Sequence, residues 1–197
     1  MKLSARTKLV LIIAGFALPI AGSYLAYYFA RPAPTGNYGE LLLPPAHVPS
    51  HSFERIAGRS WNFAQLQGSW ALTMSDSGAC EAACVEKLTT LRQVRLALGR
   101  NASRVARVYV VDDLAAPDPQ VLDPFEGTVV ALTPRGMQLP SGAANDRAHI
   151  YLIDPNGNVM MRWPSGADRK RMLKDLERLL KASQIGHNHG LAKTVPC

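Results

Sequence analysis

The chain has 197 residues, an apolar share of 47%, a net charge of +7 and three cysteines. That length is enough for one domain with its own hydrophobic core, plus some appended sequence. A basic chain invites nucleic acid as a partner, but these basic residues are spread over two predicted helices and the N-terminal flank, without interleaved aromatic residues. We therefore exclude nucleic-acid binding and interpret the charge as a solvated basic face beside an anionic membrane surface.

The first predicted element is an uncharged run of 22 residues, Leu9 to Ala30. As a helix it is roughly 33 Å long, enough to cross a hydrocarbon core of about 30 Å. Pro19 lies inside the run, where a membrane helix tolerates it with a kink. We predict a transmembrane anchor over residues 9–30, and a cleaved signal peptide stays open because the small-residue sequences AGS and YFA offer cleavage sites.

The flanks of this run predict its orientation. Lys2, Arg6 and Lys8 precede it, whereas only Arg31 follows closely. This bias predicts a single-pass protein of the bacterial inner membrane, with residues 1–8 in the cytoplasm and the rest in the periplasm. In an oxidising compartment, thiols end as disulfides, as metal ligands or under an active reductant.

Residues 31–50 carry five prolines and predict an extended linker rather than a packed element. A globular domain is expected over residues 51–184 and a flexible tail over 185–197. His47 and His51 are interpreted as linker decoration. His187, His189 and Cys197 in the tail form only a weak metal-binding signal.

Within the domain, a short buried strand is expected from Trp70 to Met74, after a turn at Gln67-Gly68. A helix follows from Cys80 to about Gly99, because apolar residues recur at three- and four-residue spacings. The apolar run Val108 to Val111 predicts a second strand, parallel to the first.

The second half of the domain begins with an irregular crossover and a segment, TVVALTP, that fits either a short strand or a loop. A hairpin is expected in AHIYLIDPNGNVMMRWP, with its turn at residues 154–157. An amphipathic helix follows from Asp168 to Ser183. The fold class is therefore α/β, a mixed sheet with helices on its faces. The acids of the crossover region are interpreted as capping and turn residues: Asp112, Asp113, Asp118 and Asp123.

Cys80 and Cys84 lie where the first strand passes into the first helix. Ligands and reactive groups gather at the carboxyl ends of such strands, where a helix N-terminus stabilises an anion such as a thiolate. Cysteines at this spacing share one helix face, so they can form a disulfide or hold one soft metal ion. A redox couple, a metal site, a structural disulfide and plain core residues all remain open.

These residues resemble the Sco/SenC family of membrane-anchored, thioredoxin-like proteins that serve copper-site assembly in cytochrome c oxidase. The resemblance covers roughly residues 55 to 183. It rests on the N-terminal anchor, the Cys-x-x-x-Cys and the YLIDPNGNVMMRW hairpin. It also rests on the pattern Leu-x-Gly-x-Trp-x-Leu that precedes the cysteines, here Leu66, Gly68, Trp70 and Leu72. It implies a thioredoxin fold in which the two cysteines and one histidine bind copper or exchange electrons.

The chain departs from the family pattern near both cysteines. Glu81 and Val85 stand where the family usually has prolines, and Asp146 stands at the position of its copper-binding histidine. His149, two residues before Tyr151, is the candidate third ligand. Without an imidazole, the site favours redox exchange or two-coordinate Cu(I) over a three-ligand copper site.

Three functions stay open from the sequence. The first is an assembly factor that delivers Cu(I) to an oxidase subunit, or keeps its thiols reduced, through Cys80, Cys84 and His149. The second is a periplasmic thiol–disulfide oxidoreductase, with Cys80 attacking and Cys84 resolving. The third is a non-catalytic, membrane-anchored scaffold.

Overall fold

The computed structural model describes residues 4–29, 36–48, 52–56, 58–134 and 146–183. The chain divides into two units, Met1–Gly36 and Asn37–Cys197. The expected tail, with His187, His189 and Cys197, lies outside the described residues, as does His51.

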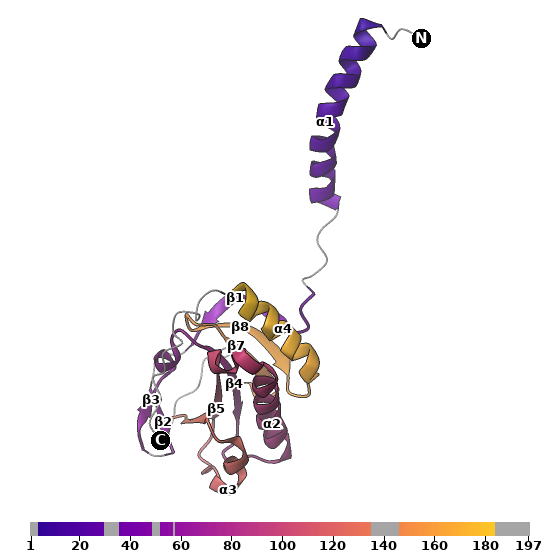
Figure 1. The fold of residues 1–197 in the computed structure, drawn as a ribbon. Helices are drawn as coiled ribbons and strands as arrows, with labels where there is room; N and C mark the ends of the chain where they lie inside the picture. Colours follow the sequence, from indigo (N-terminus) through magenta and orange to yellow (C-terminus); the bar gives the residue numbers. More distant parts are fainter. Residues whose placement is uncertain (1–3, 30–35, 49–51, 57, 135–145, 184–197) are drawn as a thin grey trace. The chain divides into compact units, whose positions relative to one another are not determined.

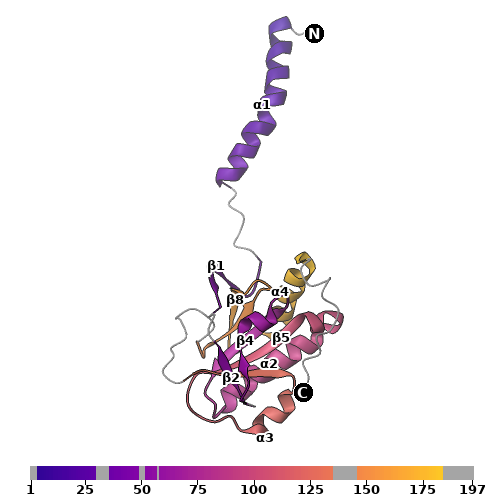
Figure 2. The same cartoon turned by 90° about the vertical axis from the view of Figure 1, so that its left-hand side faces the viewer.

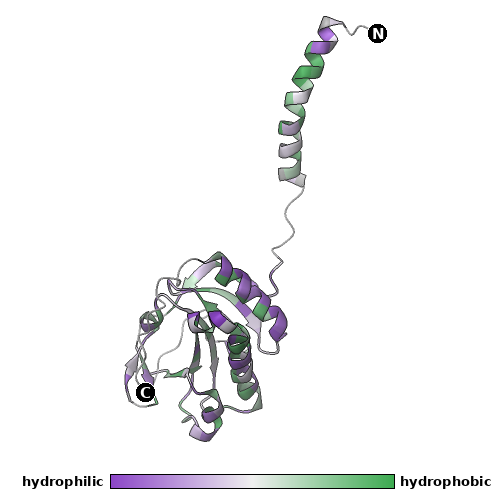
Figure 3. Ribbon diagram, viewed as in Figure 1, coloured by the Kyte–Doolittle hydropathy of each residue, from purple (hydrophilic) through white to green (hydrophobic). Residues whose placement is uncertain are grey.

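The first unit contains one long helix, α1, Ala5–Phe29 (Figure 1). Its stretch Arg6–Ala26 has a mean hydropathy of 2.1 and no buried residues, so by length and composition it is a candidate membrane span. Figure 3 shows hydrophobic residues along this helix and hydrophilic ones near its N-terminal end. Pro19 lies inside α1 without ending it, as expected.

The second unit alternates strands with short and long helices. Its elements in chain order are β1 Glu40–His47, β2 Phe53–Arg55, β3 Ser60–Trp61, η1 Phe63–Leu66, β4 Trp70–Asp76, α2 Ala82–Ala97, η2 Gly99–Arg104, β5 Val105–Val111, α3 Pro119–Leu122, η3 Asp123–Phe125, β6 Thr128–Leu132, β7 His149–Ile153, β8 Asn158–Pro164 and α4 Arg169–Ala182.

The described strands form one eight-stranded mixed sheet in the order β1-β8-β7-β4-β5-β6-β2-β3. The central strands β4, β5 and β6 are parallel, and β7, β8, β1, β2 and β3 each pair antiparallel with a neighbour. Helices α2 and α4 lie side by side on one face of the sheet in both views (Figures 1 and 2). This confirms the predicted mixed sheet flanked by helices.

Two hydrophobic clusters lie on the two faces of the sheet. The helix-side cluster contains Leu72 and Met74 of β4 with the apolar residues of α2 and α4. The opposite-side cluster contains Ala71 of β4, packed under Phe53, Phe63 and other residues of the β2–η1 region. Because both faces are covered, β4 is buried along almost its whole length, which confirms the short buried strand expected from Trp70 to Met74.

The predicted strand–helix–strand unit is confirmed. β4 and β5 pair in parallel from Trp70↔Val105 to Asp76↔Val111. The TVVALTP segment, which fitted a strand or a loop, forms β6 and pairs in parallel with β5. The crossover contains only the short helical turns α3 and η3, also as expected.

The predicted hairpin is also confirmed as β7 and β8, paired antiparallel. The Asp154 side chain accepts hydrogen bonds from the backbone N–H groups of Asn156, at 2.9 Å, and Asn158, at 2.8 Å. Gly157 has a φ of 84°, a left-handed conformation that favours glycine. The last helix starts as predicted, because the Asp168 side chain caps it by accepting from the N–H of Arg171 at 2.9 Å.

The expectation of an unpacked linker over residues 31–50 is wrong for its second half. Residues Glu40–His47 form β1, which pairs with β8, and the compact unit begins at Asn37 rather than near His51. Prolines are tolerated in β1 because it is an edge strand, and its pairing register shifts between Leu41 and Ala46, around the Pro44-Pro45 pair. The high proline content therefore led to a predicted domain start that is too late in the sequence.

Candidate functional site

Cys80 and Cys84 are joined by a disulfide, with their Cα atoms 5.0 Å apart. The expected helix start at Cys80 is wrong by two residues, because α2 begins at Ala82 with Glu81 as its N-cap. Cys80 therefore lies in the loop after β4, with a φ of 40°, and only Cys84 lies in the first helical turn. Both cysteines are buried, and Cys80, at 5% exposed, is slightly more exposed as a residue than Cys84, at 1%.

The loop that carries Cys80 is fixed on several sides. The N–H of Gly78 donates to Asp113 Oδ1 at 3.0 Å, and Tyr109 Oη donates to the carbonyl oxygen of Ser77. The Cys80 N–H donates to the same Ser77 carbonyl at 3.0 Å. A Cβ atom at Gly78 would lie 1.8 Å from the carbonyl oxygen of Ala115, so the close approach requires glycine there.

A buried lysine supports the same loop from α2. Lys87 is 1% exposed, and its Nζ lies 2.7 Å from Asp76 Oδ2, at the end of β4. The ammonium also donates to the carbonyl oxygens of Ser75, at 2.8 Å, and Arg147, at 2.7 Å. All three Lys87 protons therefore have acceptors, which is what a buried ammonium requires. Lys87 thus ties β4, the first turns of α2 and the start of β7 together.

The acids after β5 mostly have the capping and turn roles expected of them. Asp113 accepts from the N–H groups of Gly78 and Ala115, and Asp118 caps α3. Burial raises the pKa of Asp113, but hydrogen bonds from Ser77, Gly78 and Ala115 outweigh it and hold that pKa below its usual value. Asp112 instead forms an ion pair with Arg147, and this hydrogen-bonded carboxylate raises the pKa of the guanidinium.

Burial raises the pKa of Tyr109 strongly, and the nearby carboxylates of Asp76, Asp113 and Asp112 raise it further. Tyr109 therefore stays a neutral phenol that donates to the cysteine loop at any physiological pH. This hydrogen-bonding role is not identifiable from the sequence, because Tyr109 lies within an apolar run that predicts a buried strand. The role of Lys87 was missed because a lysine on a helix is usually exposed.

His149 lies at the same end of the sheet as the cysteines but on the other face. It is the first residue of β7, which runs antiparallel to β4. Side chains alternate along a strand, and Ile150 and Leu152 belong to the helix-side cluster that contains both cysteines. His149 and Tyr151 therefore share the opposite face, and their ring centroids lie 6.1 Å apart.

The imidazole of His149 is hydrogen-bonded through Nδ1 to the carboxylate of Asp146. The pKa of Asp146 is lowered, mainly by the backbone N–H of Ala148 and also by this imidazole. Within the described part of the chain, no three His, Cys, Asp or Glu side chains form a group that could hold a metal ion. The structure therefore brings Cys80 and Cys84 together and places His149 with Asp146. The ligand roles of these three residues stay a prediction.

The arrangement at the disulfide suits a redox pair. Glu81, the N-cap residue of α2, makes no side-chain bond to the first N–H groups of the helix. Unpaired N–H groups at a helix start stabilise a thiolate formed when the disulfide is reduced. Once reduced, the two sulfurs are also a soft donor pair that fits Cu(I).

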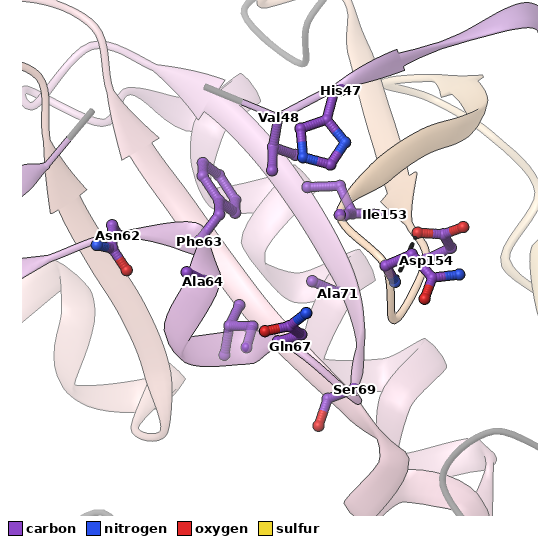
Figure 4. A pocket seen from close by; sticks show the side chains of 13 residues that line it. His47, Val48, Asn62, Phe63, Ala64, Gln67, Ser69, Ala71, Ile153 and Asp154 are labelled. Carbon is purple, nitrogen blue, oxygen red and sulfur yellow. Dashed lines mark hydrogen bonds between the residues drawn. The ribbon is translucent and has the colours of Figure 1, made fainter. Parts of the chain in front are cut away.

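A separate pocket of about 180 Å³ lies at the opposite end of β4 and does not include the cysteines. Figure 4 shows His47 and Val48 above Ile153, facing Phe63, Ala64 and Gln67 of the η1 region. The interpretation of His47 as linker decoration is wrong, because it lies in β1 and its Nδ1 is 3.1 Å from Asn158 Oδ1. Because β1 is a proline-containing edge strand, it resembles a linker in sequence, and the sequence therefore predicts a linker at His47.

The fold and the site together define a class: a thioredoxin-like domain with a Cys-x-x-x-Cys disulfide at the junction of β4 and α2, in a chain that also has a candidate membrane helix. Residues 70–183 match the family model of the transmembrane-like, thioredoxin-like, C-terminal domain, and the chain belongs to that family. No curated protein matches the sequence significantly.

Solved structures of Sco proteins share this fold. Copper-bound yeast Sco1 is 16% identical with a TM-score of 0.58, over 71% of this chain and 95% of that one. Apo Sco1 from Thermus thermophilus is 18% identical with a TM-score of 0.58, over 73% and 96%. The thioredoxin domain of a thiol-disulfide oxidoreductase from Bacteroides vulgatus is 14% identical with a TM-score of 0.50, over 70% and 98%. The resemblance to Sco/SenC proteins is thus confirmed for the fold.

Proposed function

We propose that this protein is a membrane-anchored assembly factor that exchanges thiols and disulfides through Cys80 and Cys84. Its proposed client is the cysteine pair of a copper site in a cytochrome c oxidase subunit. The disulfide at the start of α2 is the observation that supports this proposal most. The client is proposed from the fold likeness to Sco proteins, one of which is described as a member of a family of cytochrome c oxidase assembly proteins.

The exchange follows from the position of the two sulfurs. In the reduced chain, the Cys80 thiolate attacks one sulfur of a client disulfide, forms a mixed disulfide and releases the other client sulfur as a thiolate. Cys84 then attacks the Cys80 sulfur, closes the Cys80–Cys84 disulfide and releases the second client thiolate. Two electrons pass to the client, and a dithiol donor protein must reduce this chain again. Cys80 is assigned the attack because it is the more exposed of the two.

Cu(I) carriage is the second candidate function, because the reduced pair offers two soft sulfurs in a fold shared with copper-bound Sco structures. Copper would be cargo held by Cys80 and Cys84. The observed partner of His149 is Asp146 on the other face, so we propose two-sulfur coordination rather than the three-ligand set. His149 remains the candidate third ligand only if the loop before β7 rearranges.

We also propose that residues 1–8 are cytoplasmic and that the domain lies in the periplasm of a bacterial inner membrane. This rests on Lys2, Arg6 and Lys8, which precede the uncharged run that begins at Leu9, and on a disulfide that suits an oxidising compartment. An uncleaved anchor is supported by the length of α1.

The proposal is tested by trapping the client in cells, with Cys197 replaced by serine throughout. A Cys84→Ser variant lacks the resolving thiol, so mixed disulfides through Cys80 accumulate and their partner is identified by mass spectrometry. An oxidase subunit with a copper-site cysteine pair is the expected partner. The matched control, Cys80→Ser, should trap little or nothing. Equal trapping by both variants, or partners with no copper-site cysteines, would refute the assigned roles.

A further inference from the structure

The start of the compact unit is fixed on helix α4. The N–H groups of Tyr38 and Gly39 donate to the Asp175 carboxylate, at 3.0 and 2.8 Å to Oδ2. Tyr38 Oη accepts from the N–H of Asp168 at 3.1 Å, and the Arg171 guanidinium lies 3.9 Å from the Tyr38 ring centroid. The chain that follows the membrane helix is therefore held against the first half of α4.

Asp175 makes this attachment rigid. It is 2% exposed, and it also accepts from Trp163 Nε1 at 3.1 Å. A Cβ atom at Gly39 would lie 2.4 Å from the same Trp163 nitrogen, so the chain passes as close to the core as glycine allows. Both the path of the chain and the rotation of α4 about its axis are thus fixed by the same buried carboxylate.

The stretch of chain between α1 and the compact unit is short. Phe29 ends α1, and Tyr38 follows nine residues later. An extended chain covers at most about 3.6 Å per residue, which gives a limit of roughly 32 Å between these two residues. This short covalent tether keeps the compact unit, and with it α4, at a high effective concentration at the membrane proposed to hold α1.

The exposed side of α4 is basic. Met172, Leu176 and Leu180 face the core, whereas Lys170, Lys174 and Lys181 are exposed. At 100° per residue these three lysines fall within about 40° around the helix. Among the described residues none of the three has an ion-pair partner, and Glu177 is the one acid in the same strip. Figure 3 shows hydrophilic residues along much of α4.

We propose that this basic strip, Lys170, Lys174 and Lys181, docks on anionic phospholipid headgroups of the membrane that holds α1. Each basic residue at an anionic surface strengthens binding about fivefold, and tethering supplies a high effective concentration. With three lysines, a substantial fraction of the molecules has the strip bound to the headgroups, and the binding stays reversible. The inference goes beyond thiol exchange and does not depend on it.

The test uses the full chain in nanodiscs, with lysine reactivity toward a neutral acylating reagent followed by mass spectrometry. One set of nanodiscs contains phosphatidylcholine alone, and the other also contains phosphatidylglycerol. The three lysines should be acylated at least about fivefold more slowly in the anionic nanodiscs. The protection should disappear near 1 M salt, where the Debye length is about 3 Å.

The control variant is Arg59→Lys, which adds a reactive lysine far from α4. Arg59 is exposed and lies beside the edge strand β3, at the opposite edge of the sheet from β1. The reactivity of this lysine should be the same in both nanodiscs. Glu177→Lys should increase the protection of Lys170 and Lys181, and Lys174→Glu should remove most of it. Equal acylation rates in the two nanodiscs, equal slowing at residue 59, or protection that survives Lys174→Glu would each overturn the proposal.

Discussion

The two faces of the sheet at its disulfide end differ in what they offer chemically. On the helix side, two sulfurs are bonded to each other and supported by Lys87, Tyr109 and Asp113. On the opposite side, His149 is paired with Asp146 and packs near Tyr151. The comparison teaches that candidate ligands at the same end of a sheet can still lie on opposite faces. Successive residues of a strand point to alternate faces, and this separates His149 from the two cysteines.

The most severe way to break the cysteine face is to add a methyl group at Gly78. The new Cβ would lie 1.8 Å from the Ala115 carbonyl oxygen, so the Cys80 loop must move. We expect Gly78→Ala to lower the free energy of unfolding by roughly 3 kcal/mol or more, measured by urea denaturation. The matched control is Gly166→Ala, where a Cβ meets nothing within 4 Å. Equal, small effects of both changes would show that the loop is not held as described.

Removing the buried ammonium should have the next largest effect. Lys87→Met removes the ion-pair partner of Asp76 and the ammonium bonds to two carbonyl oxygens. Breaking such a pair costs about 3 kcal/mol, reduced toward about 2 because Asp76 is partly exposed. The same denaturation measurement checks it, with the exposed Lys174→Met as control. A loss no larger than that of the control would contradict the role of Lys87.

The lowered pKa of Asp113 predicts how acid affects the cysteine face. Its carboxylate is favoured in the folded state, so its contribution is present above the ordinary pKa of 3.8 and is lost as pH falls through the lowered folded value. In Asp113→Asn the free energy of unfolding should be lower than in wild type at neutral pH, and it should fall less steeply as the pH is lowered. Urea denaturation from pH 6 down to about 3 measures this. The exposed Asp123→Asn should keep the wild-type slope; an identical slope in both variants would contradict the prediction.

The smallest expected effect is that of His149→Ala on copper. Two sulfurs alone hold Cu(I) in our account, so the affinity of the reduced chain should change by less than about threefold, or about 0.6 kcal/mol. Competition with a Cu(I) chelator under anaerobic conditions gives the affinity. Cys80→Ser with Cys84→Ser serves as the variant that should lose specific binding. A tenfold or larger loss in His149→Ala would mean that the imidazole reaches the sulfurs.

Much of the fold could be predicted from the sequence. The β4–α2–β5 unit, the β7–β8 hairpin and α4 have strong periodic or turn signals, and all are confirmed. The edge strand β1 could not be predicted, because its prolines resemble those of a linker and its pairing partner lies over a hundred residues away. The position of the cysteines at a strand–helix junction was predictable for the same reason as the unit itself.

The rest of the site could not be predicted, because it depends on which face each residue takes and on contacts between distant segments. A one-residue change of register would move His149 to the side of the cysteines. The hydrogen bonds from Lys87 to Arg147, and from Gly78 to Asp113, join parts of the chain with no local signal between them. Sequence spacing alone could therefore suggest a three-residue site that the fold does not assemble.

The central claim is that Cys80 and Cys84 form a redox pair that works without His149. The most direct measurement is the rate at which each thiol of the reduced full chain is alkylated at neutral pH, in wild type and in His149→Ala. Our account predicts that Cys80 reacts about tenfold or more faster than Cys84, because Cys80 is the more exposed residue and lies in the loop just before α2, whereas Cys84 is held inside the first helical turn. It also predicts that both rates are unchanged in His149→Ala. Faster alkylation of Cys84, or a severalfold change in the Cys80 rate on loss of His149, would contradict it.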